Sequence, residues 1–124
     1  MFQTAVNGIA ATARVLLDTD VLIDHLAKRH PISREHDGAY SSIARAELYS
    51  HSSADEAVID RLLNEFEEIP VDRHIAEEAG RIRRTTRIKL PYAIVAASAI
   101  LSKRSLLTRN VRDFRRVDRL RLNG

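Results

Sequence analysis

Three acidic residues in this sequence each come shortly after a segment with the pattern of a buried strand. Residues 14–18 form an apolar run that ends on Asp18, Glu47 lies a few residues beyond the run at 39–43, and Asp113 follows the run at 105–108. In an open parallel sheet, ligands bind outside the carboxyl ends of the strands. We therefore expect the three acids to lie near one another at that edge of the sheet.

Carboxylates brought together in this way repel one another, which raises their pKa values unless a cation neutralises them. Mg²⁺ and Mn²⁺ take carboxylate and water oxygens and often keep open positions for phosphate. Such an ion could stabilise charge on a phosphodiester during displacement, so the arrangement predicts nuclease chemistry. Each acid also has an ordinary interpretation: Asp18 as a helix N-cap, Glu47 as a solvated helix residue, and Asp113 as a cap or an ion-pair partner.

The elements that must position these acids can be predicted from the apolar pattern. Helical spacing after Asp18 predicts a helix with Thr19 or Asp20 as its N-cap, and a second helix carries Glu47. Strands that alternate with helices predict an α/β fold with a mostly parallel central sheet and right-handed crossovers. The remaining expected elements are helices around residues 55–66, 75–82 and 93–101, a short extended piece at 69–71 and an edge strand at 120–122.

Length and composition fit one globular domain. The 124 residues are 44% hydrophobic and 30% charged, which allows a single core. We expect the domain to cover residues 14–124, with residues 1–13 as a loosely attached N-terminal extension. Cysteine is absent, so a metal would need oxygen or imidazole ligands. No apolar run approaches the roughly 20 residues that cross a bilayer, and we expect a cytoplasmic protein with no membrane association.

The charge distribution bears on the kind of binding partner, and the histidine spacing bears on possible metal ligands. The formal net charge is +3, and the excess of basic residues lies between residues 81 and 121, Arg104 among them. A basic half favours a polyanionic partner, although a solvated arginine-rich surface gives the same composition. The histidines, His25, His30, His36, His51 and His74, have no spacing typical of a metal site.

Four segments, taken in order, add a resemblance to these arguments. They are VLLDTDVLID at residues 15–24, AEL at 46–48, IKLPYAIVAA at 88–97 and LTRNVRDF at 107–114. Their order and spacing resemble the PIN domain family, specifically the VapC-like toxins of bacterial type II toxin-antitoxin systems. The resemblance covers about residues 14–122 and implies a PIN-like three-layer α/β/α sandwich. It also implies an endoribonuclease that depends on Mg²⁺ or Mn²⁺.

The resemblance assigns roles to particular residues. Asp18, Glu47 and Asp113 match the family's metal-binding acids, and Thr108 and Asn110 match polar residues that orient ligands beside the metal.

Two arginines in the last segment could contact the RNA. Arg109 and Arg112 are candidate phosphate contacts, with solvated surface arginines as the ordinary alternative.

One position departs from the family pattern. After Leu-Pro the family normally has an aspartate as a central metal ligand, and this chain has Tyr92. A neutral phenol is a poor ligand for Mg²⁺ and is bulkier than a carboxylate. The tyrosine could be a change that disarms a toxic enzyme or the mark of a natural inactive relative, or neighbouring acids, Asp20 in particular, could compensate. We expect severely reduced or absent nuclease activity.

The resemblance also implies partners. These are a VapB-like antitoxin whose tail crosses the acidic groove with a basic side chain, an RNA substrate, and a second copy in a homodimer or a larger toxin-antitoxin assembly. A rival interpretation is a catalytically silent PIN domain that binds its antitoxin or nucleic acid. A third is a receiver-like domain that binds Mg²⁺, but no lysine ends a late strand, where such domains need one.

Overall fold

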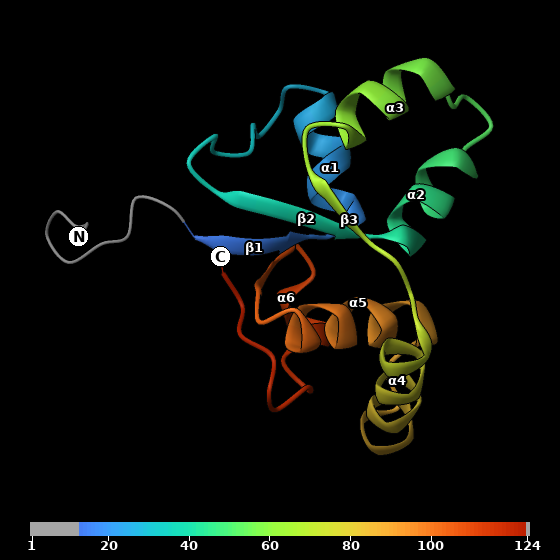
Figure 1. Ribbon diagram of the computed structural model, residues 1–124, viewed down its shortest axis with the longest axis vertical. Helices are drawn as coiled ribbons and strands as arrows, with labels where there is room; N and C mark the ends of the chain where they lie inside the picture. Colours follow the sequence, from blue (N-terminus) through green and yellow to red (C-terminus); the bar gives the residue numbers. More distant parts are fainter. Residues whose placement is uncertain (1–12, 124) are drawn as a thin grey trace, which may run out of the picture.

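The computed structural model describes residues 13–123 and is built on a four-stranded sheet (Figure 1). The strands are β1 (Arg14–Leu17), β2 (Asp37–Ser41), β3 (Glu67–Ile69) and β4 (Ser105–Leu107). All pairings are parallel, in the order β3-β2-β1-β4. The predicted parallel sheet is confirmed, and β1 and β4 are neighbours although most of the chain separates them.

Six helices cover the two faces of this sheet. Figure 1 shows α1 (Thr19–Leu26), α2 (Ser42–Tyr49) and α3 (Glu56–Leu63) on one side. On the other side lie α4 (Arg73–Thr86), α5 (Leu90–Leu101) and α6 (Val111–Phe114). The result is the expected three-layer α/β/α sandwich. None of the helices within residues 13–123 is long and apolar enough to span a membrane.

The two cores follow from the alternation of side chains along β1. Successive strand residues point to opposite faces of a sheet. Val15 and Leu17 belong to the core under α1, α2 and α3, whereas Leu16 belongs to the core under α4, α5 and α6. All three side chains are almost fully buried, which explains why this strand is a continuous apolar run.

Several boundaries differ from the sequence-based expectation: β3 begins two residues before the extended piece expected at 69–71, and helix capping explains two other differences. Asp18 is the N-cap of α1, so Thr19 and Asp20 are helical rather than capping residues. Likewise Ser41 caps α2, which ends β2 two residues before the predicted boundary at residue 43. The expected edge strand at 120–122 is reduced to a single bridge between Leu106 and Leu122.

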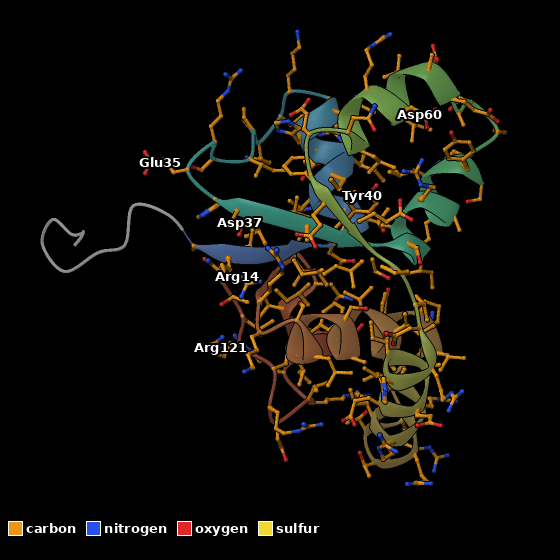
Figure 2. The ribbon with its side chains drawn as sticks, in the orientation of Figure 1. Arg14, Glu35, Asp37, Tyr40, Asp60 and Arg121 are labelled. Atoms are coloured by element: carbon orange, nitrogen blue, oxygen red, sulfur yellow. The ribbon has the colours of Figure 1, made fainter. Side chains whose placement is uncertain are left out.

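Arg104 was counted with the basic surface, and that interpretation is wrong. Its side chain is only 2% exposed and donates hydrogen bonds to the carbonyl oxygens of Asp37, at 2.6 Å, and Val15, at 3.3 Å. It also pairs with Glu67 at 3.3 Å. Figure 2 shows Arg14 and Asp37 at this same end of the sheet. Arg104 therefore joins the starts of β1, β2 and β3 instead of facing a polyanion.

The proposed division between extension and domain falls largely outside the described residues. Of the expected N-terminal extension, 1–13, only Ala13 is described, and it precedes β1 directly.

Candidate active site

Asp18 lies at the point where β1 ends and α1 begins. Its Oδ1 accepts a hydrogen bond from the backbone N–H of Thr19 at 2.9 Å, and its Oδ2 accepts one from the hydroxyl of Thr108 at 2.7 Å. Both Asp18 and Thr108 are 7% exposed. Because β1 and β4 are parallel neighbours, the residues that follow them meet at the carboxyl end of the sheet.

The surroundings of Asp18 favour its neutral form. The pKa of Asp18 is raised from 3.8 to about 6, mainly by burial and also by the negative charges of Asp20 and Glu47. The hydrogen bonds from Thr108 and Thr19 act in the opposite direction. A buried carboxyl with a raised pKa in a cluster of acids is typical of a functional site, and a nearby cation would return it to the ionised form.

Glu47 reaches the same place from α2. Its Oε1 accepts a hydrogen bond from the hydroxyl of Thr19 at 2.5 Å. Since the backbone N–H of Thr19 also binds Asp18, this threonine bridges the two acids. The sequence analysis considered Thr19 only as a cap and missed this role.

Asp20, in the first turn of α1, faces the loop that follows β4. Its Oδ2 accepts a hydrogen bond from the backbone N–H of Arg109 at 3.2 Å, and burial raises its pKa. Its other oxygen, Oδ1, is buried and has no hydrogen-bond partner in the described part of the chain. A buried carboxylate oxygen without a donor is a feature that a bound cation would satisfy.

The loop after β4 supplies the remaining polar residues. The hydroxyl of Thr108 accepts a hydrogen bond from the backbone N–H of Asn110 at 2.9 Å while donating its own to Asp18. The side-chain amide of Asn110 donates to Oδ2 of Asp113 at 3.2 Å. Asp113 is thus connected to Asp18 through Thr108 and Asn110. The short helix α6, which carries Asp113, was not predicted.

Tyr92 lies near the start of α5, partly buried against the core beneath the sheet. Its ring packs against the buried ring of Phe114, with centroids 5.4 Å apart and planes tilted by 52°. Phe114 directly follows Asp113, so position 92 is next to the helix that carries the last acid. The phenol ring is accommodated as an apolar group in this core.

The acids are gathered, but they do not form a complete metal cage. Among residues 13–123, no three acidic or histidine side chains lie close enough together to hold a metal ion. The donor set nevertheless fits a hard cation in chemical type, since it consists of carboxylate oxygens with one unpartnered oxygen on Asp20. Position 92, where the resemblance implied an aspartate, holds the phenol of Tyr92.

The two arginines of the loop after β4 differ in their surroundings. Arg112 is exposed on α6. Arg109 donates from its Nε to Oδ2 of Asp24 at 3.1 Å, and Asp24, only 2% exposed, also pairs with Arg29 at 3.1 Å. Sequence reasoning missed Asp24, although it stands four residues after Asp20 and therefore on the same face of α1.

Comparison with known families decides the identity of this fold. A family model described as "PIN domain" matches residues 15–120. This chain belongs to the PIN domain family. PIN domains are in general nucleases, and the site at the carboxyl end of the sheet is the place where this PIN domain gathers its acidic side chains.

Solved structures support the same assignment. A chain of a toxin-antitoxin complex from Klebsiella pneumoniae is 30% identical, with a TM-score of 0.72, and the match covers 86% of this PIN domain chain and 94% of the other. A chain of VapBC2 from Rickettsia felis, bound to a promoter DNA fragment, is 21% identical with a TM-score of 0.75, covering 89% and 97%. A chain of DNA-bound VapBC from Salmonella typhimurium is 23% identical with a TM-score of 0.75, covering 90% and 97%. No curated protein sequence matches the chain.

Proposed function

We propose that this PIN domain is the toxin component of a toxin-antitoxin pair, built to cleave RNA phosphodiesters with Mg²⁺ or Mn²⁺ and impaired by Tyr92. The observation that carries the proposal is the hydrogen-bonded connection from Glu47 through Thr19, Asp18 and Thr108 at the carboxyl end of the sheet. Side chains from three separate parts of the chain converge there. The similarity to a toxin-antitoxin complex at 30% identity supports the biological role.

The proposed metal ligands are Asp18, Glu47 and Asp113, with Asp20 as a substitute. A divalent ion would neutralise these charges and stabilise the charge that develops on a phosphodiester. The chain's own contribution is positional: Thr108 directs Oδ2 of Asp18, and Thr19 directs Oε1 of Glu47. Side chains fixed by such hydrogen bonds lose little freedom when they bind a charged ligand.

Asn110 and the arginines complete the proposed site. Asn110 holds Asp113 through its side-chain amide. Arg109 and Arg112 are proposed phosphate contacts, and Arg109 is the better placed because Asp24 fixes its guanidinium beside the acids.

Tyr92 is the proposed cause of impaired activity. The ring packs against Phe114 where the family pattern calls for a carboxylate. One missing charge leaves fewer oxygens for the ion, and even the loss of outer hydrogen bonds commonly weakens metal binding by about 10- to 100-fold. Asp20, whose Oδ1 has no partner in the described residues, is the acid best placed to compensate.

The proposed partners follow from the related complexes. A VapB-like antitoxin would bind the acidic groove with a basic side chain, which would satisfy the same carboxylates without metal. We expect a homodimer, or a larger assembly with the antitoxin, in the cytoplasm. The second candidate function, a silent binding module for antitoxin or nucleic acid, is favoured by one observation, the lack of a three-acid metal site among residues 13–123.

A Mn²⁺ titration by calorimetry tests the proposal and separates the two candidates. The Tyr92→Asp variant should bind Mn²⁺ at least about ten-fold more tightly than the unaltered chain, and Asp18→Ala in that variant should remove the gain. If Tyr92→Asp binds Mn²⁺ no better than the unaltered chain, the metal-nuclease proposal fails and the binding module is the better account.

A further inference from the structure

A pocket of about 480 Å³ adjoins the acidic site on the side of Arg109. It lies between α1, the loop that joins α1 to β2, and the end of β4. Thr108, whose hydroxyl binds Asp18, contributes to its wall, as do Asp24 and Arg109. Its volume falls within the range of about 300–1,000 Å³ that is common for small-ligand pockets.

The lining combines apolar surface with groups that can form hydrogen bonds. Val21, Pro31, Ile32 and Leu107 supply the apolar part.

The polar part of the lining includes two imidazole rings. His30, Ser33 and His36 come from the loop between α1 and β2, and Ser33 and His36 also line the neighbouring pocket of about 690 Å³. Nδ1 of His36 is buried and has no hydrogen-bond partner within residues 13–123. Apolar walls, imidazole rings and an unpartnered polar atom suit a single unstacked nucleobase, because proteins read such bases by stacking and by hydrogen bonds to their edges.

The position of Arg109 links this pocket to the acidic site. Its backbone N–H is held by Asp20 and its guanidinium by Asp24, two acids one turn apart on α1. The guanidinium is therefore fixed between the pocket and the carboxylates while its side chain stays 60% exposed. An arginine held in this place can contact the RNA phosphate that lies between a base bound in the pocket and the phosphodiester bond at the acidic site.

The larger pocket of about 690 Å³ on the other side of the same loop is less suited to RNA. It lies at the starts of β2 and β3, and its lining includes Asp37, Glu65 and Glu67. Although two of these acids pair with Arg104, the pocket lies at the opposite end of the sheet from Asp18, so a base bound there would not adjoin a phosphodiester at the acidic site. In the smaller pocket the single acid, Asp24, is paired with two arginines.

We propose that the pocket between α1 and the 27–36 loop binds one unstacked nucleobase of a single-stranded RNA, next to the phosphodiester held at the acidic site. This inference rests on the proposed ribonuclease function and names its substrate class. His30 and His36 contact the base, and Arg109 contacts the adjoining phosphate.

Mononucleotide binding in a metal-free buffer with chelator tests the pocket without any need for cleavage. The probes are the four ribonucleoside 5′-monophosphates, with ribose 5-phosphate as the probe that lacks a base, and the readout is the NMR signals of the histidine rings. At least one nucleotide should shift the signals of His30 and His36 but not those of His74, which is exposed on α4. Ribose 5-phosphate should leave His30 and His36 unshifted.

Three variants sharpen the test. His30→Ala, which alters a ring that lines this pocket and not the larger one, should weaken nucleotide binding by about ten-fold, the effect of one lost hydrogen bond or stacking contact. Ser33→Trp, at an exposed position on the wall, should block the pocket without disturbing the core, and His74→Ala should have no effect.

Two results would overturn the inference: no nucleotide shifts His30 or His36, or ribose 5-phosphate shifts them as strongly as the nucleotides do. The second result would mean that the pocket recognises an anion rather than a base. If Tyr92→Asp cleaves RNA while no nucleotide shifts these rings, the pocket proposal fails and the nuclease proposal stands. If nucleotides bind as expected while Tyr92→Asp never cleaves, the nuclease proposal fails alone.

Discussion

The hydroxyl of Thr108 donates a hydrogen bond of 2.7 Å to Oδ2 of Asp18, across the ends of two neighbouring parallel strands. The bond joins residues 90 positions apart in the sequence and is buried. It stabilises the ionised form of a carboxyl group that burial otherwise keeps partly neutral. This contact is the centre of the site, because Glu47 and Asp113 connect to it through Thr19 and Asn110.

Thr108→Val should destabilise the protein more at pH 8 than at pH 5. The substitution removes the hydroxyl that Asp18 needs when ionised, so the pKa of Asp18 should rise above about 6. The expected loss at pH 8 is about 1–3 kcal/mol in the free energy of unfolding, as for a buried group left without its partner. Urea denaturation at both pH values measures it. Thr108→Ser keeps the hydroxyl and should lose much less; equal losses for the two variants would contradict the account.

Asp18→Asn should gain stability relative to the unaltered chain as the pH rises. The pKa of Asp18 is about 6 in the folded protein and 3.8 without the fold, so the folded state holds this proton more tightly. This tighter proton binding contributes fully to stability below pH 4, and the contribution is lost as the pH rises through 6. Between pH 5 and pH 8 the free energy of unfolding of the unaltered chain should therefore fall by about 1.4 kcal/mol, a loss that Asp18→Asn should not show.

The comparison for this prediction needs chelator and a second variant. Asp118→Asn removes an exposed acid and controls for the loss of one negative charge. A constant difference between Asp18→Asn and the unaltered chain across this range would show that the pKa of Asp18 is not raised.

The sequence was sufficient to predict the parallel sheet, the alternating helices and the convergence of Asp18 with the loop after β4. These features follow from local apolar patterns and from the geometry of parallel strands. The β2 boundary was wrong because the side chain of Ser41 caps the next helix, a contact that the apolar pattern does not show. The helix α6 was missed because four residues are too few for a helical period.

The side-chain pairings could not be predicted in the same way. Arg104 precedes a strand in an arginine-rich half, and only the fold shows that its guanidinium binds Asp37 and Glu67 at the opposite end of the sheet from Asp18. The Asp24–Arg109 pair likewise joins distant parts of the chain. Composition counts both arginines as available charge, whereas one is buried and the other is held by a buried acid.

Arg104→Met should lower the free energy of unfolding by about 3 kcal/mol. The substitution removes a buried cation and leaves the carbonyl oxygens of Val15 and Asp37 without their donor. Arg119→Met is the matched control, because Arg119 also pairs with an acid, Glu78, but its own side chain is 62% exposed. The control should change stability by less than about 1 kcal/mol. Equal effects in urea denaturation would mean that Arg104 does not join the strands.

The central claim is that this PIN domain is a ribonuclease scaffold weakened at position 92, and RNA cleavage with Mn²⁺ tests it most directly. The account predicts that Tyr92→Asp cuts single-stranded RNA at least about 100-fold faster than the unaltered chain. Cleavage should require Mn²⁺ or Mg²⁺ and should disappear when Asp18→Ala is added. If the unaltered chain cuts RNA as fast as Tyr92→Asp under the same conditions, Tyr92 does not impair the site and the account is contradicted.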